Sequence, residues 1–405
     1  MSAATARWAY DTGAKRDLRI DFLRGAAMIG MIVDHTGGDS SWLYVLTGGN
    51  RFFVSAAEAF FFMSGFVTGV VYSGLIARES VGVAVMKMLH RAVVLYVLTV
   101  VLGVGLPLLA SWLGLPWEQP FGQGSALDFI VSILTLHRTY YLADIILTYV
   151  LLFSCAALAI ALVSEGYTSV VLVGSWAIWL GWQLWPQFSQ LPWDIQNDAV
   201  FHFSSWQLLF FNALVIGAHR RAFASQLARI PRWVYGVGSA LLFAGCIALY
   251  RSQLAVFKVM LPRVSTQQLA NVLFSKADVR IGRLIVFAIT ATFAFTLVTQ
   301  LWKPLFSLLG WLFVPLGQQS LSAYTFHLAV VAFITRGAPL ILGSGPYSAG
   351  QNAVLQLTAV TVVWAAVSAQ PRLAHLAHLL DQAEHRLLDE AHAVLLKIPL
   401  MSQGP

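Results

Sequence analysis

The sequence predicts an all-α fold, a polytopic transmembrane helical bundle of about ten spans. Only 11% of the 405 residues are charged and 58% are hydrophobic, whereas a soluble domain carries roughly 25% charged residues. Apolar runs long enough to cross a bilayer recur between residues 20 and 371. Fourteen Trp and twelve Tyr suit a protein with two membrane–water interfaces. We therefore expect one transmembrane domain over residues 20–371.

The apolar runs define the expected spans in chain order, with edges set to within a few residues. They are 20–37, 52–76, 86–110, 141–163, 168–186, 204–218, 233–250, 284–302, 318–335 and 350–370. A shorter stretch, 126–137, is interpreted as a half-helix, and another, 305–314, is cut by Pro315. Irregular backbone at membrane depth persists only where it is buried in protein or faces a cavity.

The basic residues near the span ends predict the topology. Three clusters fall on one side of a ten-span arrangement: Lys15, Arg16 and Arg19; Arg78, Lys87 and Arg91; and Arg220, Arg221, Arg229 and Arg232. The loops 111–125 and 187–203 contain no Lys or Arg, as expected on the other side. Both termini, including the N-terminal segment 1–19, are therefore predicted to be cytoplasmic. That segment lacks the apolar core of a cleavable signal, so the first span should remain as an anchor.

The segment 251–283 departs from this charge pattern, because it should lie outside yet holds six basic residues. Three of them, Lys276, Arg280 and Arg283, repeat at helical spacing and are predicted to share one face. That face would attract an anionic substrate. The alternative interpretation is a solvated helix end.

Other features carry no separate chemistry. Residues 372–405 are interpreted as an amphipathic C-terminal helix and tail lying along the membrane. Its histidines recur every seven residues, without the i, i+4 spacing of a helical zinc site, so no metal is expected. Cys155 and Cys246 lie inside apolar runs and suggest no disulfide. The net charge of +7 is explained by topology, and no nucleic-acid partner is expected.

Ionisable residues inside the first span are the strongest functional signal, because such groups are costly in a bilayer. Arg24 and His35 are eleven residues apart, so they share a helix face about 16 Å apart along the axis. Asp21 lies one turn before Arg24 and is expected to pair with it. Asp34 adjoins His35 and faces elsewhere. Either Arg24 is a topology anchor and His35 an interfacial residue, or His35 is a general base and Arg24 holds an anionic group.

The second span favours the catalytic interpretation. Glu58 is a carboxylate in an aromatic-rich helix, and it can orient a histidine on a neighbouring helix. Gly65 and Gly69 form a small-residue stripe, shared with Phe62, that permits close approach of another helix. By contrast, His202 is interpreted as an interfacial residue and His327 as part of a packed, hydrogen-bonded helix face.

These residues resemble a known family. Arg24, ten residues and then His35, followed by Phe-Phe-Met-Ser-Gly at 61–65, resembles the type-3 membrane acyltransferase superfamily. Within it the chain looks most like the OpgC family. The matching blocks are Arg16-Asp-Leu-Arg-Ile-Asp-Phe-Leu-Arg-Gly25, Asp34-His35, Ala56-Ala-Glu58, Val71-Tyr72, 134–144, 206–210, 276–283 and 316–320.

The resemblance implies succinylation of osmoregulated periplasmic glucans at the bacterial inner membrane. The implied donor is a cytoplasmic acyl-CoA, with succinyl-CoA expected, and no cofactor is permanently bound. The implied partners are acyl-CoA, a glucan and the lipid bilayer, with a homo-oligomer possible. The implied roles are His35 as base with Asp34 or Glu58 orienting it, Arg24, Arg19, Lys276, Arg280 and Arg283 as donor contacts, and Asp144, Tyr141 and Trp206 as acceptor contacts.

Two other classes of function stay open at this stage. A transporter or exporter of a small anionic or glycan substrate also has buried charges and broken helices, although no inverted repeat is evident. A scaffold without chemistry is a third alternative, and the joint presence of Arg24, His35 and Glu58 argues against it.

Overall fold

The computed structural model describes Tyr10 and residues 16–117, 125–260 and 263–370. These residues form a helical bundle with no named strand, and one isolated bridge joins Arg138 to Gln196. The helices are α2 (Leu18–Thr36), α3 (Tyr44–Thr47), α4 (Ala56–Ile76), α5 (Val81–Leu113), α6 (Ala126–Leu134), α7 (Asp144–Ser164), α8 (Thr168–Leu184), α9 (Phe203–Ala218), α10 (Arg220–Leu227), α11 (Arg232–Arg251), α12 (Ala255–Met260), α13 (Thr266–Phe274), α14 (Ile281–Gln300), α15 (Trp302–Gln318) and α16 (Ser320–Leu342). A last helix covers Ala349–Gln370.

The predicted all-α membrane fold is confirmed at the level of the bundle. Among the described residues, seven helices are long and apolar enough to cross a membrane: α4, α5, α7, α11, α14, α16 and Ala349–Gln370. The predicted spans at α8 and α9 are apolar helices of fewer than 18 residues, and α2 carries several charges. The count of ten spans therefore remains a prediction. The amphipathic C-terminal helix lies outside the described residues.

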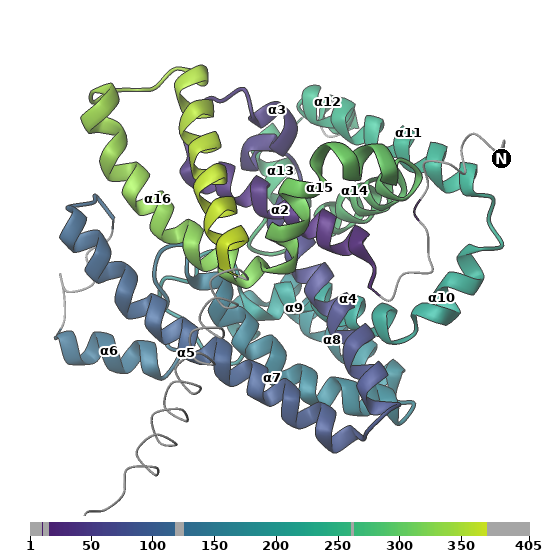
Figure 1. Ribbon diagram of the computed structural model, residues 1–405. Helices are drawn as coiled ribbons and strands as arrows, with labels where there is room; N and C mark the ends of the chain where they lie inside the picture. Colours follow the sequence, from purple (N-terminus) through teal and green to yellow (C-terminus); the bar gives the residue numbers. More distant parts are fainter. Residues whose placement is uncertain (1–9, 11–15, 118–124, 261–262, 371–405) are drawn as a thin grey trace, which may run out of the picture.

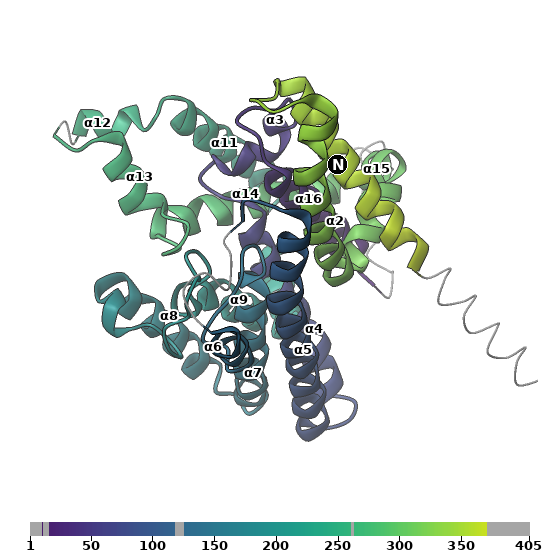
Figure 2. The ribbon, with the colours of Figure 1, turned by 90° about the vertical axis from the view of Figure 1, so that its left-hand side faces the viewer.

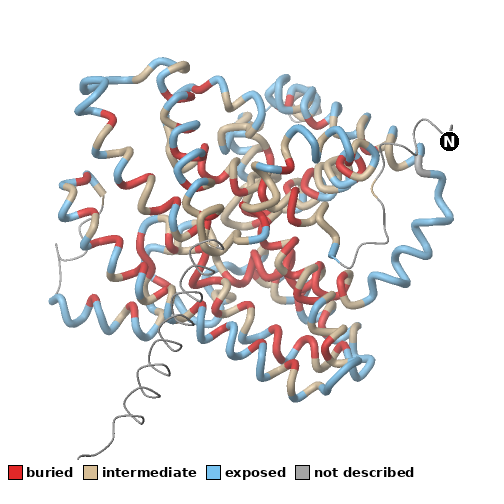
Figure 3. The backbone as a smooth tube through the Cα atoms, viewed as in Figure 1, coloured by how far each residue is buried: buried red, intermediate tan, exposed pale blue. Residues whose placement is uncertain are grey.

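The bundle is organised around α2, which packs against α15, α4 and α16 (Figure 1). Helices α4 to α9 fill the lower half of Figure 2, and α11, α12 and α13 lie at its upper left. Buried positions gather at the centre of the bundle, whereas α10 is exposed along its whole length (Figure 3). Large apolar side chains on α11, such as Leu241 and Leu242, face outward, as expected for a helix in contact with lipid.

Glycines set the two closest helix crossings. A Cβ atom at Gly65 or Gly69 of α4 would overlap backbone atoms of Phe210 or Leu214 on α9. Likewise a Cβ at Gly25 of α2 would overlap the Phe313 carbonyl on α15. The close approach predicted for the Gly65 and Gly69 stripe is thus confirmed, and it brings the aromatic face of α4 against α9.

Two local predictions were wrong. Pro315 does not cut its segment, because α15 continues to Gln318. The proline removes one helical hydrogen bond to the Trp311 carbonyl, and the Trp364 indole donates to that oxygen instead, at 3.0 Å. The stretch 276–283 is not one helical face either. The backbone turns through Val279, which has a positive φ of 48°, and α14 begins only at Ile281.

Candidate active site

Two histidines from α2 and α16 meet in the core of the bundle. His35 Nδ1 lies 2.8 Å from His327 Nε2, and the two rings stack with centroids 5.1 Å apart. His327 is completely buried and His35 is half-buried. The side chain bonded to His35 is thus an imidazole rather than the predicted carboxylate, and it comes from a residue 292 positions away in the chain.

The neighbouring groups determine which ring nitrogens carry protons. His327 Nδ1 contacts the backbone carbonyl of Tyr324, and a carbonyl only accepts hydrogen bonds, so this nitrogen must donate. In a neutral ring the opposite nitrogen, His327 Nε2, is then an acceptor. His35 Nδ1 must consequently donate to it, which leaves an unprotonated Nε2 on His35. This tautomer is the one that a general base requires.

Glu58 does not orient His35. As the third residue of α4, Glu58 curls back onto the helix start, where it accepts from the Ser55 backbone N–H at 2.9 Å and from its hydroxyl at 2.8 Å. Its other oxygen pairs with the Arg283 guanidinium, and both side chains are buried. Arg283 also donates to the Phe274 carbonyl at 3.2 Å. This ion pair therefore ties α4 to α14.

Asp34 does not contact His35 through a hydrogen bond either. Its buried Oδ1 has no hydrogen-bond partner in the described part of the chain. The pairing predicted between Asp21 and Arg24 is also wrong, because Asp21 accepts two hydrogen bonds from Arg16, at 2.7 and 2.8 Å. The Arg24 side chain is thus left without a carboxylate partner among the described residues.

A cavity of about 360 Å³ lies next to the helices that carry the histidine pair. Its walls come from α2, α4, α5, α7 and α16, and the polar side chains that line it are Arg24, Ser64, Thr68, Tyr72, Arg91, Tyr149, Ser320 and Tyr324. The apolar Met31 lines it as well. Met31 lies one helical turn before His35, and Tyr324 lies one turn before His327. Neither imidazole lines the cavity, but the Tyr324 ring in its wall lies 4.9 Å from the His327 ring.

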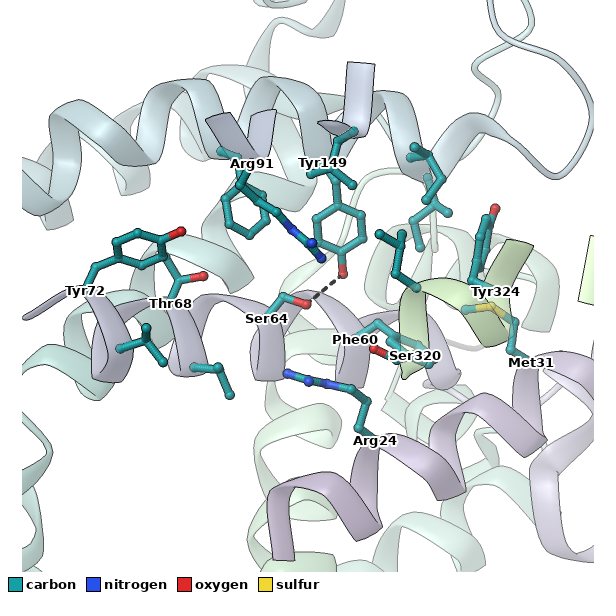
Figure 4. Close-up of a pocket in the computed structure, with 17 residues that line it drawn as sticks. Arg24, Met31, Phe60, Ser64, Thr68, Tyr72, Arg91, Tyr149, Ser320 and Tyr324 are labelled. Carbon is teal, nitrogen blue, oxygen red and sulfur yellow. Dashed lines mark hydrogen bonds between the residues drawn. The ribbon is translucent and has the colours of Figure 1, made fainter. Parts of the chain in front are cut away.

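Two guanidinium groups project into this cavity from opposite walls, Arg24 from α2 and Arg91 from α5 (Figure 4). Arg24 makes one long contact, 3.5 Å from Nη2 to the Met63 carbonyl, and its buried Nε has no partner among the described residues. Between them the Ser64 hydroxyl donates to Tyr149 at 3.4 Å. Incompletely satisfied guanidinium groups in a cavity suit an anionic ligand.

None of the predicted acceptor residues lines this cavity, although Ile145, next to Asp144, does. Trp206 is completely buried, donates to the Val200 carbonyl at 2.6 Å and packs on Phe61, so it is a wall rather than an accessible contact. Tyr141 is 51% exposed. With Trp117, Pro116 and Asn197 it lines a second cavity of about 340 Å³. Asp144 begins α7, three residues further along.

The predicted donor contacts are dispersed. Arg19 pairs with Asp17 at 2.6 Å, and its guanidinium lies against the rings of Tyr10 and Phe295. These contacts hold the Arg19 side chain in the packing of the bundle. Arg280 lies 3.4 Å from Asp278. Lys276 donates to Asn50 Oδ1 at 3.1 Å. Of the predicted donor contacts, Arg24 alone lines the cavity of Figure 4.

His327 was predicted to lie on a packed, hydrogen-bonded helix face, and it does. Its contact with His35 was not predicted, and neither was the place of Arg91 in the cavity wall. A signal for His327 was present, since an ionisable residue inside an apolar span is a functional candidate by default. Arg91 gave no comparable signal, because basic residues near span ends are common.

The apolar helices define a multi-pass membrane protein, and inside its bundle a histidine pair lies beside a cavity lined by two arginines. Residues 16–374 match the family model described as OpgC protein, and the chain belongs to this family. Membership implies a membrane acyltransferase-like role on glucans. No curated protein and no solved structure matches the chain.

Proposed function

We propose that this protein transfers an acyl group, succinyl in particular, from cytoplasmic acyl-CoA to a hydroxyl of a periplasmic glucan. The observation that carries this proposal is the His35–His327 hydrogen bond beside a cavity that Arg24 and Arg91 line; Tyr324, in the wall of that cavity, has its ring centroid 4.9 Å from that of His327. In this proposal the phosphates of the donor bind the two guanidinium groups. The thioester then lies near His35, and the acceptor approaches from the side of Tyr141 and Asp144.

The proposed chemistry is one acyl transfer. The sugar hydroxyl oxygen attacks the thioester carbonyl carbon while His35 Nε2 takes the hydroxyl proton. The carbon–sulfur bond then breaks, and the imidazolium returns the proton to the departing thiolate. The products are an ester of the glucan and free CoA, and the enzyme ends in its starting protonation state. His327 holds His35 in the required tautomer throughout.

Purified protein incubated with a linear or cyclic glucan and either succinyl-CoA or acetyl-CoA tests this proposal. We expect free CoA and a glucan heavier by the acyl mass. H35A should abolish both products, whereas H90A, which changes an exposed histidine of α5, should leave them intact. Glucan movement across vesicles without any release of CoA would instead support a transporter.

A further inference from the structure

Of the three basic residues between 276 and 283, two are neutralised and one is not. Arg283 is paired with Glu58, and Arg280 lies 3.4 Å from Asp278. Lys276 has a neutral partner, the Asn50 side chain, at 3.1 Å, and its ammonium lies 5.8 Å from the centre of the Phe201 ring. Within the described ranges, no carboxylate lies at ion-pair distance from Lys276.

The charge of Lys276 acts on residues of the candidate reaction centre. Lys276 is half-buried and interacts electrostatically with His35, Asp34 and Asp144. Phe201 stacks on Phe61, whose ring stacks in turn on Tyr149. Tyr149 lines the cavity of Figure 4, named the donor cavity because the proposed function places the acyl-CoA there. A row of aromatic rings, Phe201, Phe61 and Tyr149, thus connects the Lys276 ammonium to the wall of that cavity.

A half-buried ammonium with only an amide partner has lost water without gaining a full counter-charge. A ligand carboxylate placed beside it would form a charge-assisted hydrogen bond, roughly twice as strong as a neutral one. Arg24 lies eleven residues, about three helical turns, before His35 on α2, and Arg91 lies on α5. Lys276 lines neither of the two cavities, and its charge acts on His35.

We propose that Lys276 forms a carboxylate subsite, which holds the distal carboxylate of a dicarboxylic acyl group while its thioester lies at His35. This inference rests on the proposed function and adds its acyl specificity. A four-carbon diacid chain would then be preferred over an uncharged chain of the same length. Lys276 is in this account a binding residue, with no part in proton transfer.

The test compares kcat/KM for succinyl-CoA and for butyryl-CoA, which has the same four-carbon chain without the carboxylate. In the unmodified protein, succinyl-CoA should be preferred by about 10- to 150-fold, the size of one hydrogen bond to a charged group. K276M should remove most of this preference by lowering the value for succinyl-CoA alone. K276R should keep it, and K303M, which removes an exposed lysine of α15, should not change it.

Two results would overturn the carboxylate subsite: no preference in the unmodified protein, or an unchanged preference in K276M, which includes an equal loss for both donors. K276Q repeats the comparison with an amide that can still bond to Asn50, in case K276M does not fold. Turnover of butyryl-CoA with no succinyl preference contradicts this inference alone. Failure of the unmodified protein to use any acyl-CoA contradicts the proposed function as well.

The pH dependence gives an independent readout. Burial lowers the pKa of the Lys276 ammonium, and the nearby carboxylates of Glu58, Asp34 and Asp144 offset this only in part, with Arg283 lowering it further. The ammonium is charged below its lowered pKa and loses its charge as the pH rises through it. The succinyl preference should therefore decline at alkaline pH in the unmodified protein and persist in K276R, because an arginine stays protonated.

Discussion

Single hydrogen bonds determine which atom of this site can act as a base. The Tyr324 carbonyl fixes the proton of His327, and His327 fixes the proton of His35. This is the orienting role that a carboxylate has in many catalytic triads, performed here by a neutral imidazole. The sequence alone indicated His35 and the need for an orienting partner, but not that partner, because His327 is distant in the chain.

Removing His327 should slow the transfer without weakening donor binding. H327A leaves His35 Nδ1 without an acceptor, so the wrong tautomer becomes accessible and kcat should fall on the order of 100-fold. KM for acyl-CoA should stay close to its original value, because His327 does not line the donor cavity. H327Q, whose amide oxygen can accept the hydrogen bond, should recover part of the rate. A higher KM with unchanged kcat in H327A would contradict this role.

The Glu58–Arg283 pair should contribute to stability rather than to catalysis. E58Q leaves a buried guanidinium without its counter-charge, which should cost about 3–5 kcal/mol of unfolding free energy. The double variant E58L/R283L should recover most of this loss, because no charge remains buried. Denaturant or thermal unfolding in detergent measures both. The control variant E79Q alters a solvent-exposed pair and should change the unfolding free energy by roughly 0.5 kcal/mol or less. A similarly small change in E58Q would contradict the stabilising role of the Glu58–Arg283 pair.

At the scale of helices, apolar runs and glycine spacing predicted most of what the structure contains. Each predicted span coincides with a helix, because a backbone in lipid must satisfy its own hydrogen bonds. The errors arose where distant residues intervene. The Trp364 indole compensates for Pro315. The turn through Val279 leaves Lys276 and Arg280 in the connection between α13 and α14, whereas Arg283 lies within α14. Neither effect can be read from local spacing.

Two glycines of α4 should differ in their tolerance of a larger side chain, because only one of them lies at the crossing with α9. At Gly65 any Cβ overlaps the Phe210 backbone, whereas at Gly74 no atom lies within 4 Å. G65L should therefore strongly reduce the yield and thermal stability of the folded protein, since overpacking costs at least about 1–3 kcal/mol. G74L should be close to the unmodified protein. Equal stability of the two variants would show that the crossing is not closely packed.

For the molecule as a whole, the important relation is between the two cavities and the histidine pair. The donor cavity holds Arg91 and Tyr72, next to the predicted cytoplasmic loop between α4 and α5. The second cavity holds Trp117 and Asn197, from loops predicted to lie outside, and Tyr141, the first residue of a predicted span. The Tyr324 hydroxyl, in the wall of the first cavity, donates to the Leu142 carbonyl in the segment that carries Tyr141. In the proposed function the reaction centre therefore lies between a donor side and an acceptor side. The span pattern predicts the two sides, and the Tyr324 contact shows that the walls of the two cavities meet.

Transfer between the two sides of a sealed membrane is the most direct test of this account. Inside-out membrane vesicles, with glucan trapped in the lumen and succinyl-CoA supplied only outside, reproduce the proposed arrangement. We predict succinylated glucan in the lumen and free CoA outside, with both lost in H35A. If glucan became acylated only when both substrates shared one compartment, the proposal that acyl transfer at His35 links the two sides of the membrane would be wrong.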